Sequence, residues 1–204
     1  MDDTIERLYY SLGDEADTKT IRHIKRYDFM ASNAKDNIKR VKDILDFGCG
    51  SGYGSRLLKK AFPEANVIGY DVSEEAMKYA IDNNAVNGVI FLTKLQEVLK
   101  NKPFDIVILC DMIEHLTDDE QKQILDVLTK HSPKATVYIS TPLSNYNGQS
   151  QTNKYHINMF TRDRFERLLH NYFGKLELWL LDWSFSRKLH AKEQYGGVVA
   201  ICQM

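Results

Sequence analysis

Short apolar runs alternate with amphipathic stretches along most of the chain after residue 40. The runs are rich in Ile, Val, Leu and Phe, and between them apolar positions recur at helical spacing, as in residues 118–130. Continuous apolar runs are typical of strands covered on both faces, and strand–helix alternation predicts a parallel sheet. We therefore expect buried strands at residues 43–47, 66–70, 89–93, 104–110 and 135–141.

The two ends of the chain follow a different pattern. Residues 1–40 are polar and helix-compatible, which predicts a helical cap ahead of a core formed by residues 41–204. A helix is expected at residues 161–172, followed by strands at 176–183 and 196–203. A polar, basic loop alone separates these two strands, so we expect an antiparallel hairpin at one edge of the sheet. With 204 residues the chain is long enough to bury one core, and a single domain is predicted.

Composition and charge narrow the class of protein. Hydrophobic residues make up 43% of the chain and charged residues 27%, which argues against disorder. The net charge of −1 gives no sign of a polyanionic partner. Cys49, Cys110 and Cys202 lie far apart, which favours reduced thiols over a disulfide framework or a zinc site. No apolar run approaches the roughly 20 residues that span a bilayer, and the acidic start is unlike a signal peptide. A cytoplasmic protein without a membrane partner is expected.

A glycine-rich loop, LDFGCGSGYG at residues 45–54, follows the first strand. Glycines at a strand-to-helix turn allow positive φ and close approach to a ligand, but alone they also suit NAD, FAD or a plain turn. Asp46 would repel a pyrophosphate and attract a ligand that carries an ammonium and a sulfonium. Asp71, 19 positions after Gly52, is placed to bind two ribose hydroxyls. The alternative is that both acids merely begin helices.

The loop resembles the first motif of the class I S-adenosylmethionine-dependent methyltransferases, and GYDVS at residues 69–73 resembles their second. The resemblance implies a Rossmann-like, seven-stranded, mostly parallel sheet of order 3-2-1-4-5-7-6, with strand 7 antiparallel and helices on both faces. Many relatives contact adenine through an acid after strand 3, and here Leu95 or Gln96 takes that place. The resemblance implies S-adenosylmethionine as cofactor, near Asp46, Gly48, Cys49, Gly50, Gly52, Asp71, Val72, Leu95, Gln96 and Asp111.

A second group of polar residues follows the fourth strand. Asp111, Glu114 and His115 stand at i, i+3 and i+4 and share a face if the segment forms a helical turn. The carboxyl ends of strands 4 and 5 flank the transferred methyl group in this fold, so His156 is expected to face the same pocket. Two carboxylates and two imidazoles form a candidate site for Mg²⁺ or Mn²⁺, which would bind the acceptor and lower the pKa of its hydroxyl.

This pattern resembles two families. Small-RNA 3′-terminal ribose 2′-O-methyltransferases share it, together with a Thr-Pro-x-x-x-Tyr-Asn run, here 141–147, and a His-x-x-x-x-Thr-Arg run, here 156–162. Ubiquinone-pathway O-methyltransferases share the acid-acid-His arrangement. Metal-free small-molecule methyltransferases also carry Glu-His-Leu, in which the histidine is a general base or a pocket wall. His115, Glu114 and His156 are therefore the catalytic candidates, and Asp111 with these three is the candidate metal set, although Asp111 is shorter than the expected Glu.

The segment His23-Ile-Lys-Arg-Tyr-Asp-Phe-Met-Ala31 resembles an element ahead of the first motif in some bacterial methyltransferases. If it forms a lid, Tyr27 or Arg26 reaches the pocket. Otherwise it is a packing helix in which Tyr27 and Phe29 cover the sheet edge.

The preferred function is methyl transfer from S-adenosylmethionine to an oxygen, or less readily a nitrogen, of a small metabolite or sugar. An imidazole, with an ordinary pKa near 6.5, suits removal of the acceptor proton. One alternative is a metal-assisted RNA ribose 2′-O-methyltransferase. RNA binding needs several cationic contacts, and residues 184–192 form the one obvious basic cluster. A second alternative is a cofactor-binding regulatory protein without catalysis. The sequence identifies neither the acceptor nor the oligomeric state.

Overall fold

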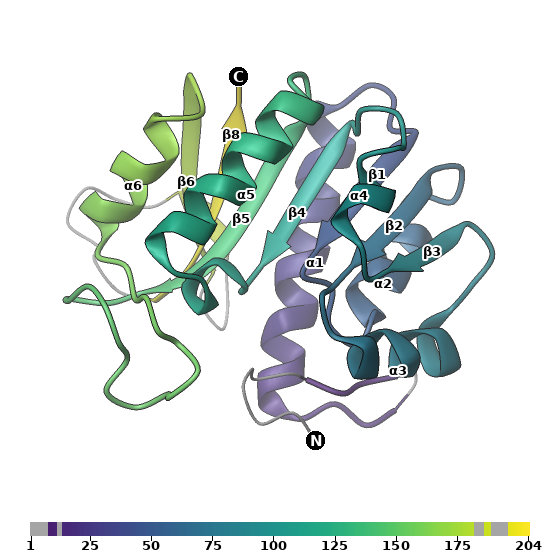
Figure 1. Ribbon diagram of the computed structural model, residues 1–204, viewed down its shortest axis with the longest axis horizontal. Coiled ribbons are helices and arrows are strands. Elements are labelled where there is room, and N and C mark those ends of the chain that lie inside the picture. Colours follow the sequence, from purple (N-terminus) through teal and green to yellow (C-terminus); the bar gives the residue numbers. More distant parts are fainter. Residues whose placement is uncertain (1–7, 12–13, 182–185, 189–195) are drawn as a thin grey trace. The chain divides into compact units, whose positions relative to one another are not determined.

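A computed structural model describes the chain except residues 1–7, 12–13, 182–185 and 189–195 (Figure 1). Its described residues form two compact units, which are joined between Cys110 and Asp111. Among the described helices, none is long and apolar enough to cross a membrane. The expectation that the chain is a single domain stays a prediction.

The unit that ends at Cys110 is a parallel sheet with helices. Strand β1 pairs with β2 on one side and with β4 on the other, and β2 pairs with β3, all in parallel. Every residue of β4 is buried, as the continuous apolar run predicts. The elements of this unit are α1 (Thr18–Asn37), β1 (Asp43–Phe47), α2 (Tyr53–Ala61), β2 (Asn66–Tyr70), α3 (Glu74–Asn84), β3 (Val89–Leu92), α4 (Leu95–Val98) and β4 (Ile106–Cys110).

In this unit, polar side chains cap the starts of two helices. Asp17 caps α1 by accepting a hydrogen bond from the backbone N–H of Thr20 at 2.7 Å. Ser73 caps α3 by accepting from Ala76 N at 3.2 Å, which agrees with the Ser-acid start seen in the sequence. The expected helical cap is narrower than residues 1–40, because the described residues before Thr18 are not helical.

The unit that begins at Asp111 is built on antiparallel pairs. Strand β8 lies between β5 and β6, and β7 pairs with the far edge of β6. Helices α5 and α6 lie on the same face of these strands (Figure 1). Thr117 and Glu120 form a capping box at the start of α5. The elements are the 3₁₀ turn η1 (Ile113–His115), α5 (Asp118–His131), β5 (Thr136–Leu143), α6 (Arg162–His170), β6 (Lys175–Leu181), β7 (Ser186–Lys188) and β8 (Gly196–Gln203).

The strand order β3-β2-β1-β4-β5-β8-β6-β7 confirms the expected Rossmann-like topology, with β8 as the antiparallel seventh strand of the prediction. One correction is needed. The segment expected to be a loop between β6 and β8 contains the short edge strand β7, while its residues 184–185 and 189–195 lie outside the described part of the chain. Three polar residues suit a sheet edge, but they are too few to show an alternating apolar pattern.

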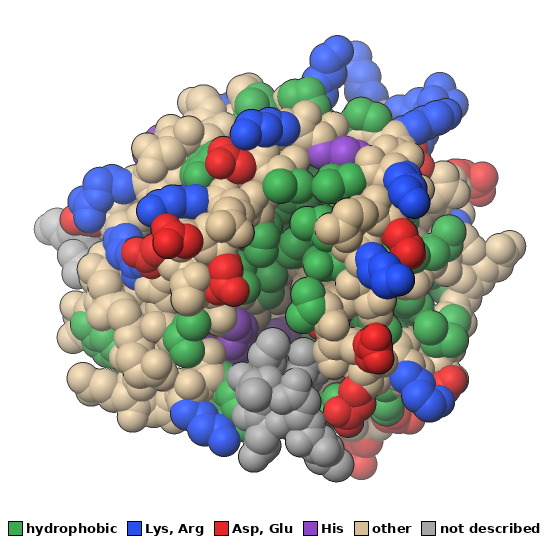
Figure 2. All heavy atoms as spheres, viewed as in Figure 1, with side chains coloured by type: hydrophobic (Ala, Val, Ile, Leu, Met, Phe, Trp, Pro, Cys, Tyr) green, Lys and Arg blue, Asp and Glu red, His purple; other side chains and the backbone are tan. Residues whose placement is uncertain are grey.

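Charged side chains of both signs are interspersed on the face shown in Figure 2. This distribution agrees with the net charge of −1. The three cysteines are buried, and none of them forms a disulfide.

Candidate cofactor and acceptor sites

Two glycines of the glycine loop, Gly50 and Gly52, have different surroundings. Gly52 has φ of 81° and precedes α2, and a Cβ at this position would lie 2.6 Å from Cζ of Phe91. Gly50 also has a positive φ, 53°, but a Cβ there would meet no atom within 4 Å. Packing therefore requires glycine at 52, whereas the backbone at 50 borders open space that a ligand can approach closely.

Asp71 ties this loop to the end of β2. Its Oδ2 accepts a hydrogen bond from Gly50 N at 3.0 Å, and its Oδ1 accepts from Ser73 N at 2.9 Å. Gly48 N and Cys49 N both donate to the carbonyl oxygen of Tyr70, at 2.7 and 2.9 Å. Each carboxylate oxygen has two lone pairs, so Asp71 retains acceptor capacity for ribose hydroxyls.

Asp46 lies at the base of the loop, fully buried. The hydroxyl of Tyr27 donates to its Oδ1 at 2.9 Å, and the hydroxyl of Ser55 donates to its Oδ2 at 2.7 Å. Burial raises the pKa of Asp46 to about 6, while the two hydroxyl donors act in the opposite direction. A direct contact between Asp46 and the cofactor's amino group stays a prediction. The buried carboxylate places negative charge beneath the loop without exposing an oxygen.

Tyr27 belongs to α1 and is itself buried. Its ring occupies the space beside Gly54, where a Cβ would overlap it. Burial, and then the charge of Asp46, raise the pKa of Tyr27 well above its ordinary value, so the phenol remains a neutral donor. Of the two interpretations of the 23–31 segment, these contacts favour the packing helix. No local pattern in the sequence links Tyr27 or Ser55 to the carboxylate of Asp46.

The remaining cofactor candidates of this unit surround the same strand ends. Cys49 is buried, and burial raises the pKa of its thiol well above the ordinary value. Val72 is exposed by 64%, directly after Asp71. Leu95 is half-buried and Gln96 exposed at the start of α4. Contact of any of them with adenine or ribose stays a prediction.

In the other unit, Glu114, His115 and His156 converge. One ligand atom from each lies within 4.8 Å of the others, an arrangement able to hold a metal ion. Glu114 and His115 come from η1, and His156 comes from the segment between β5 and α6. The two imidazole rings meet edge to face, with centroids 4.9 Å apart.

The orientation of His115 is fixed through one ring nitrogen. Its Nδ1 lies 2.8 Å from the carbonyl oxygen of Tyr155. A carbonyl oxygen only accepts hydrogen bonds, so Nδ1 is the donor and the neutral ring keeps its lone pair on Nε2. A hydrogen bond of this kind also orients metal-binding histidines. Nε2 is thus the ring nitrogen whose lone pair can accept a proton or bind a cation.

Glu114 is held by the strand and the loop around it. Its side chain is fully buried, and Oε2 accepts a hydrogen bond from Thr141 Oγ1 at 3.1 Å. Its carbonyl oxygen accepts from Asn158 N at 3.0 Å, two residues after His156. These bonds hold Glu114 to β5 and to the loop that carries His156.

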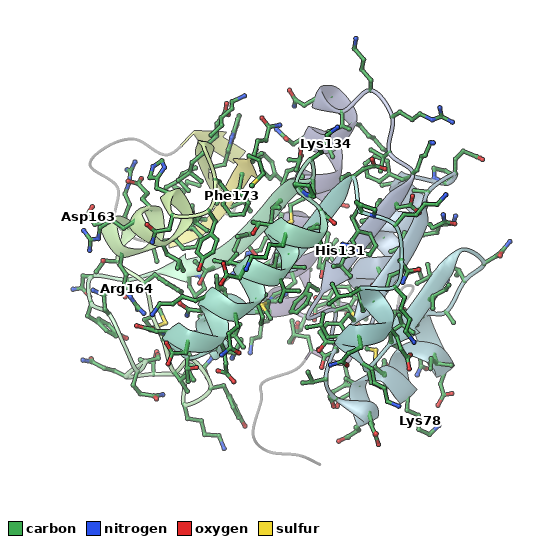
Figure 3. All side chains as sticks on the ribbon, turned by 45° about the horizontal axis from the view of Figure 1, so that its top comes forward. Lys78, His131, Lys134, Asp163, Arg164 and Phe173 are labelled. Atoms are coloured by element: carbon green, nitrogen blue, oxygen red, sulfur yellow. The ribbon has the colours of Figure 1, made fainter. Side chains whose placement is uncertain are left out.

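A further polar network fixes that loop to α5. Asn158 Nδ2 donates to Asp118 Oδ1 at 2.5 Å and to Leu116 O at 3.1 Å. Arg164, labelled in Figure 3 near the start of α6, donates to the same Asp118 oxygen and to Met159 O. Asn158 and Arg164 were not singled out from the sequence, because nothing in its local pattern links them to residue 118.

Asp111 does not join this cluster. The helical turn covers residues 113–115 alone, and Asp111 has φ of 47°, so the expected i, i+3, i+4 face is not formed. Its Oδ1 instead accepts a hydrogen bond from Ser140 Oγ at 2.6 Å. A role for Asp111 as a metal ligand or in cofactor binding stays a prediction.

Comparison with known sequences gives a family. A family model described as a methyltransferase domain matches residues 20–172. The ubiquinone biosynthesis O-methyltransferase of Rickettsia bellii is 29% identical over 123 residues, which are 57% of this chain and 49% of that protein. The malonyl-[acyl-carrier protein] O-methyltransferase of Acetivibrio thermocellus is 36% identical over 100 residues, 43% of this chain and 35% of that protein. The chain thus matches half or less of the length of these relatives.

Solved structures agree with the fold. The methyltransferase domain of bacterial CtHen1 (the CN structure) has a TM-score of 0.66 at 19% identity, over 90% of this chain and 100% of that chain. Small RNA methyltransferase HEN1 has a TM-score of 0.70 at 19% identity, over 95% of this chain and 27% of that chain. At such identities the likeness concerns the fold alone.

Proposed function

Because the chain belongs to the methyltransferase-domain family, and so to the class I S-adenosylmethionine-dependent methyltransferases, we propose that it methylates an oxygen of a small metabolite or sugar. The observation that carries the proposal is the 2.8 Å contact between His115 Nδ1 and the carbonyl oxygen of Tyr155. The Nδ1–H bond to Tyr155 O leaves a lone pair on Nε2, as removal of a proton from an acceptor hydroxyl requires.

The first unit supplies the residues for the methyl donor. S-adenosylmethionine carries the reactive methyl group on a sulfonium, beside an ammonium and a ribose. Asp71 would accept hydrogen bonds from the ribose hydroxyls, and the bare backbone at Gly50 would allow the ligand to approach closely. Asp46, ionised at neutral pH given a pKa of about 6, would attract the two cationic groups. The residues present therefore fit this cofactor.

The second unit supplies the residues for the acceptor. Methyl transfer is a direct displacement, so the protein mainly aligns the reactants and removes one proton. Nε2 of His115 would accept that proton, and the buried carboxylate of Glu114 would stabilise the imidazolium that forms. Tyr155 O keeps the ring from turning over.

The convergence of three ligand atoms favours a second candidate function, metal-assisted methylation of an RNA ribose 2′-hydroxyl. Glu114, His115 and His156 would hold the ion, which would lower the pKa of a bound hydroxyl. Two imidazoles and one carboxylate suit Mn²⁺ or another transition ion better than Mg²⁺, which prefers oxygen ligands. Most of the basic cluster at 184–192 lies outside the described residues.

A panel of hydroxyl and amine acceptors, assayed by release of S-adenosylhomocysteine, tests the proposal. We expect turnover with a hydroxyl acceptor. His115→Asn keeps an N–H donor near the position of Nδ1 but is smaller and has no basic nitrogen, so it should bind S-adenosylhomocysteine normally and lose turnover. His170→Asn, at an exposed position in the same unit, is the matched control. Full turnover by His115→Asn would exclude His115 as the base. Turnover with amines alone would exclude O-methylation. Binding without turnover of any acceptor would favour a regulatory protein.

A further inference from the structure

A concave surface lies in the unit that ends at Cys110. It is a groove of about 640 Å³, which we call the basic groove. Four cationic side chains, two asparagines, two carboxylates and an apolar floor line it. The residues used in the argument below are Arg40, Lys42, Lys100, Lys102, Ile68 and Ile90.

The basic groove is separate from the glycine loop. Asp43 and Asn66, which line it, are the first residues of β1 and β2, whereas Gly50 and Asp71 follow the last residues of these strands. A five-residue strand is about 16 Å long, so the groove and the loop lie at opposite ends of the same strands. A ligand in the groove would not occupy the cofactor site.

The charge of the groove is poorly balanced by its neighbours. Of its two lining carboxylates, Asp43 accepts a hydrogen bond from Asn66 Nδ2 at 2.9 Å, and Glu64 is the other. The nearby Asp105 uses Oδ2 to accept from the backbone N–H groups of Lys42 and Asp43, at 2.7 and 3.1 Å. Within the described part of the chain, none of the four cationic side chains is in an ion pair. Like charges gathered around one concavity repel, and an anion would relieve that repulsion.

The floor of the groove restricts the kind of anion. Ile68 and Phe104 are buried at its base, and Ile90 is exposed by 57%. A bare inorganic ion would leave this apolar surface in water. A ligand with several phosphates and a flat ring body would cover the floor and meet the cations at once. A nucleic-acid strand usually stacks on exposed aromatic rings, and the aromatic residue in the lining, Phe104, is buried.

We propose that the basic groove binds a nucleoside polyphosphate, with the ring on the exposed side chain of Ile90 and the phosphates on Lys42, Lys100 and Lys102. This site goes beyond the proposed methyl transfer and does not depend on it. Lys100 and Lys102 are both exposed and follow α4, so changing them leaves the strands and the glycine loop intact.

Fluorescence anisotropy of N-methylanthraniloyl-ATP, with the whole chain saturated with S-adenosylhomocysteine, tests the site. We expect saturable binding that weakens about tenfold in the variant Lys100→Ala/Lys102→Ala, because two charge-assisted contacts are lost. The variant Lys78→Ala/Lys134→Ala carries the same change of charge at exposed positions outside the groove, labelled in Figure 3, and should bind like the wild type. Equal S-adenosylhomocysteine affinity in all three proteins shows that the variants fold.

Three results would overturn the proposal. The first is equal nucleotide affinity in the two double variants. The second is nucleotide binding that occurs without S-adenosylhomocysteine and is lost at saturation, which would place the nucleotide in the cofactor site. The third is tighter binding of a single-stranded RNA oligomer than of the nucleotide, lost in Lys100→Ala/Lys102→Ala, which would make the groove a nucleic-acid site.

Discussion

The hydrogen bond between Tyr27 and Asp46 gives a sharp prediction about stability and pH. Tyr27→Phe keeps the ring that fills the space beside Gly54 and removes only the hydroxyl that donates to Oδ1 at 2.9 Å. The carboxylate then has one donor, Ser55, instead of two. A hydrogen bond to a buried charged group contributes about 2 kcal/mol, so the free energy of unfolding should fall by about this amount where Asp46 is ionised.

The pH dependence follows from the direction of the pKa shift. Asp46 is an acid whose pKa rises from 3.8 to about 6 on folding, so the folded state binds its proton more tightly than the unfolded chain. This carboxyl therefore makes the free energy of unfolding decrease as pH rises through that interval, by about 3 kcal/mol in all. Because the Tyr27 hydroxyl lowers the pKa of Asp46, its removal raises that pKa further, and the decrease in the free energy of unfolding becomes larger.

Urea unfolding followed by circular dichroism measures the effect directly. The loss caused by Tyr27→Phe should be about 1 kcal/mol near pH 4, where Asp46 is protonated in both proteins, and about 2–3 kcal/mol near pH 8. Tyr79→Phe removes a phenol hydroxyl from α3 without touching the carboxylate and should show no such dependence. A loss that is equal at both pH values would refute the charge-assisted bond.

Other predictions concern the loop and the histidine cluster. Gly52→Ala should lower the free energy of unfolding by about 2–3 kcal/mol in urea titrations, because its Cβ would clash with Phe91 in a left-handed backbone. Gly50→Ala, with open space at its Cβ, should lower the free energy of unfolding by about 1 kcal/mol and chiefly weaken S-adenosylhomocysteine binding. A larger loss of stability in Gly50→Ala than in Gly52→Ala would contradict the open space beside Gly50. If the cluster binds Mn²⁺, electron paramagnetic resonance should show at least about tenfold weaker binding in His156→Ala than in the control His170→Ala. Equal affinity in both variants would remove the metal site.

Much of the fold follows from where apolar runs begin and end. Strands β1, β2 and β8 have the bounds that the sequence predicts, because polar residues or glycines limit each run sharply. Strand β5 extends two residues further than expected, since Pro142 and Leu143 still pair with β8. A proline lacks the N–H that a strand uses, so a strand end was the natural expectation there.

The sequence predicts which residues belong to the candidate site, but not which contacts they make. Asp46 was placed from the glycine loop and Asp71 from its spacing after that loop and from the GYDVS segment, whereas the donors to Asp46 come from α1 and α2 and meet only in the folded chain. For Asp111, the sequence predicts a shared face that the structure does not form. Its spacing from Glu114 suggested a shared face, but a left-handed backbone turns it to Ser140, and backbone conformation of this kind has no signature in spacing.

Isothermal titration calorimetry with S-adenosylhomocysteine tests most directly whether the glycine loop and Asp71 form the cofactor site. The wild-type chain should bind one equivalent. Asp71→Asn should bind at least about tenfold more weakly, because a neutral amide replaces the carboxylate and the hydrogen bonds to the ribose are no longer charge-assisted. Asp82→Asn, an exposed acid on α3, is the matched control and should bind like the wild type. Absence of binding to the wild type, or equal affinity in Asp71→Asn, would contradict the cofactor site.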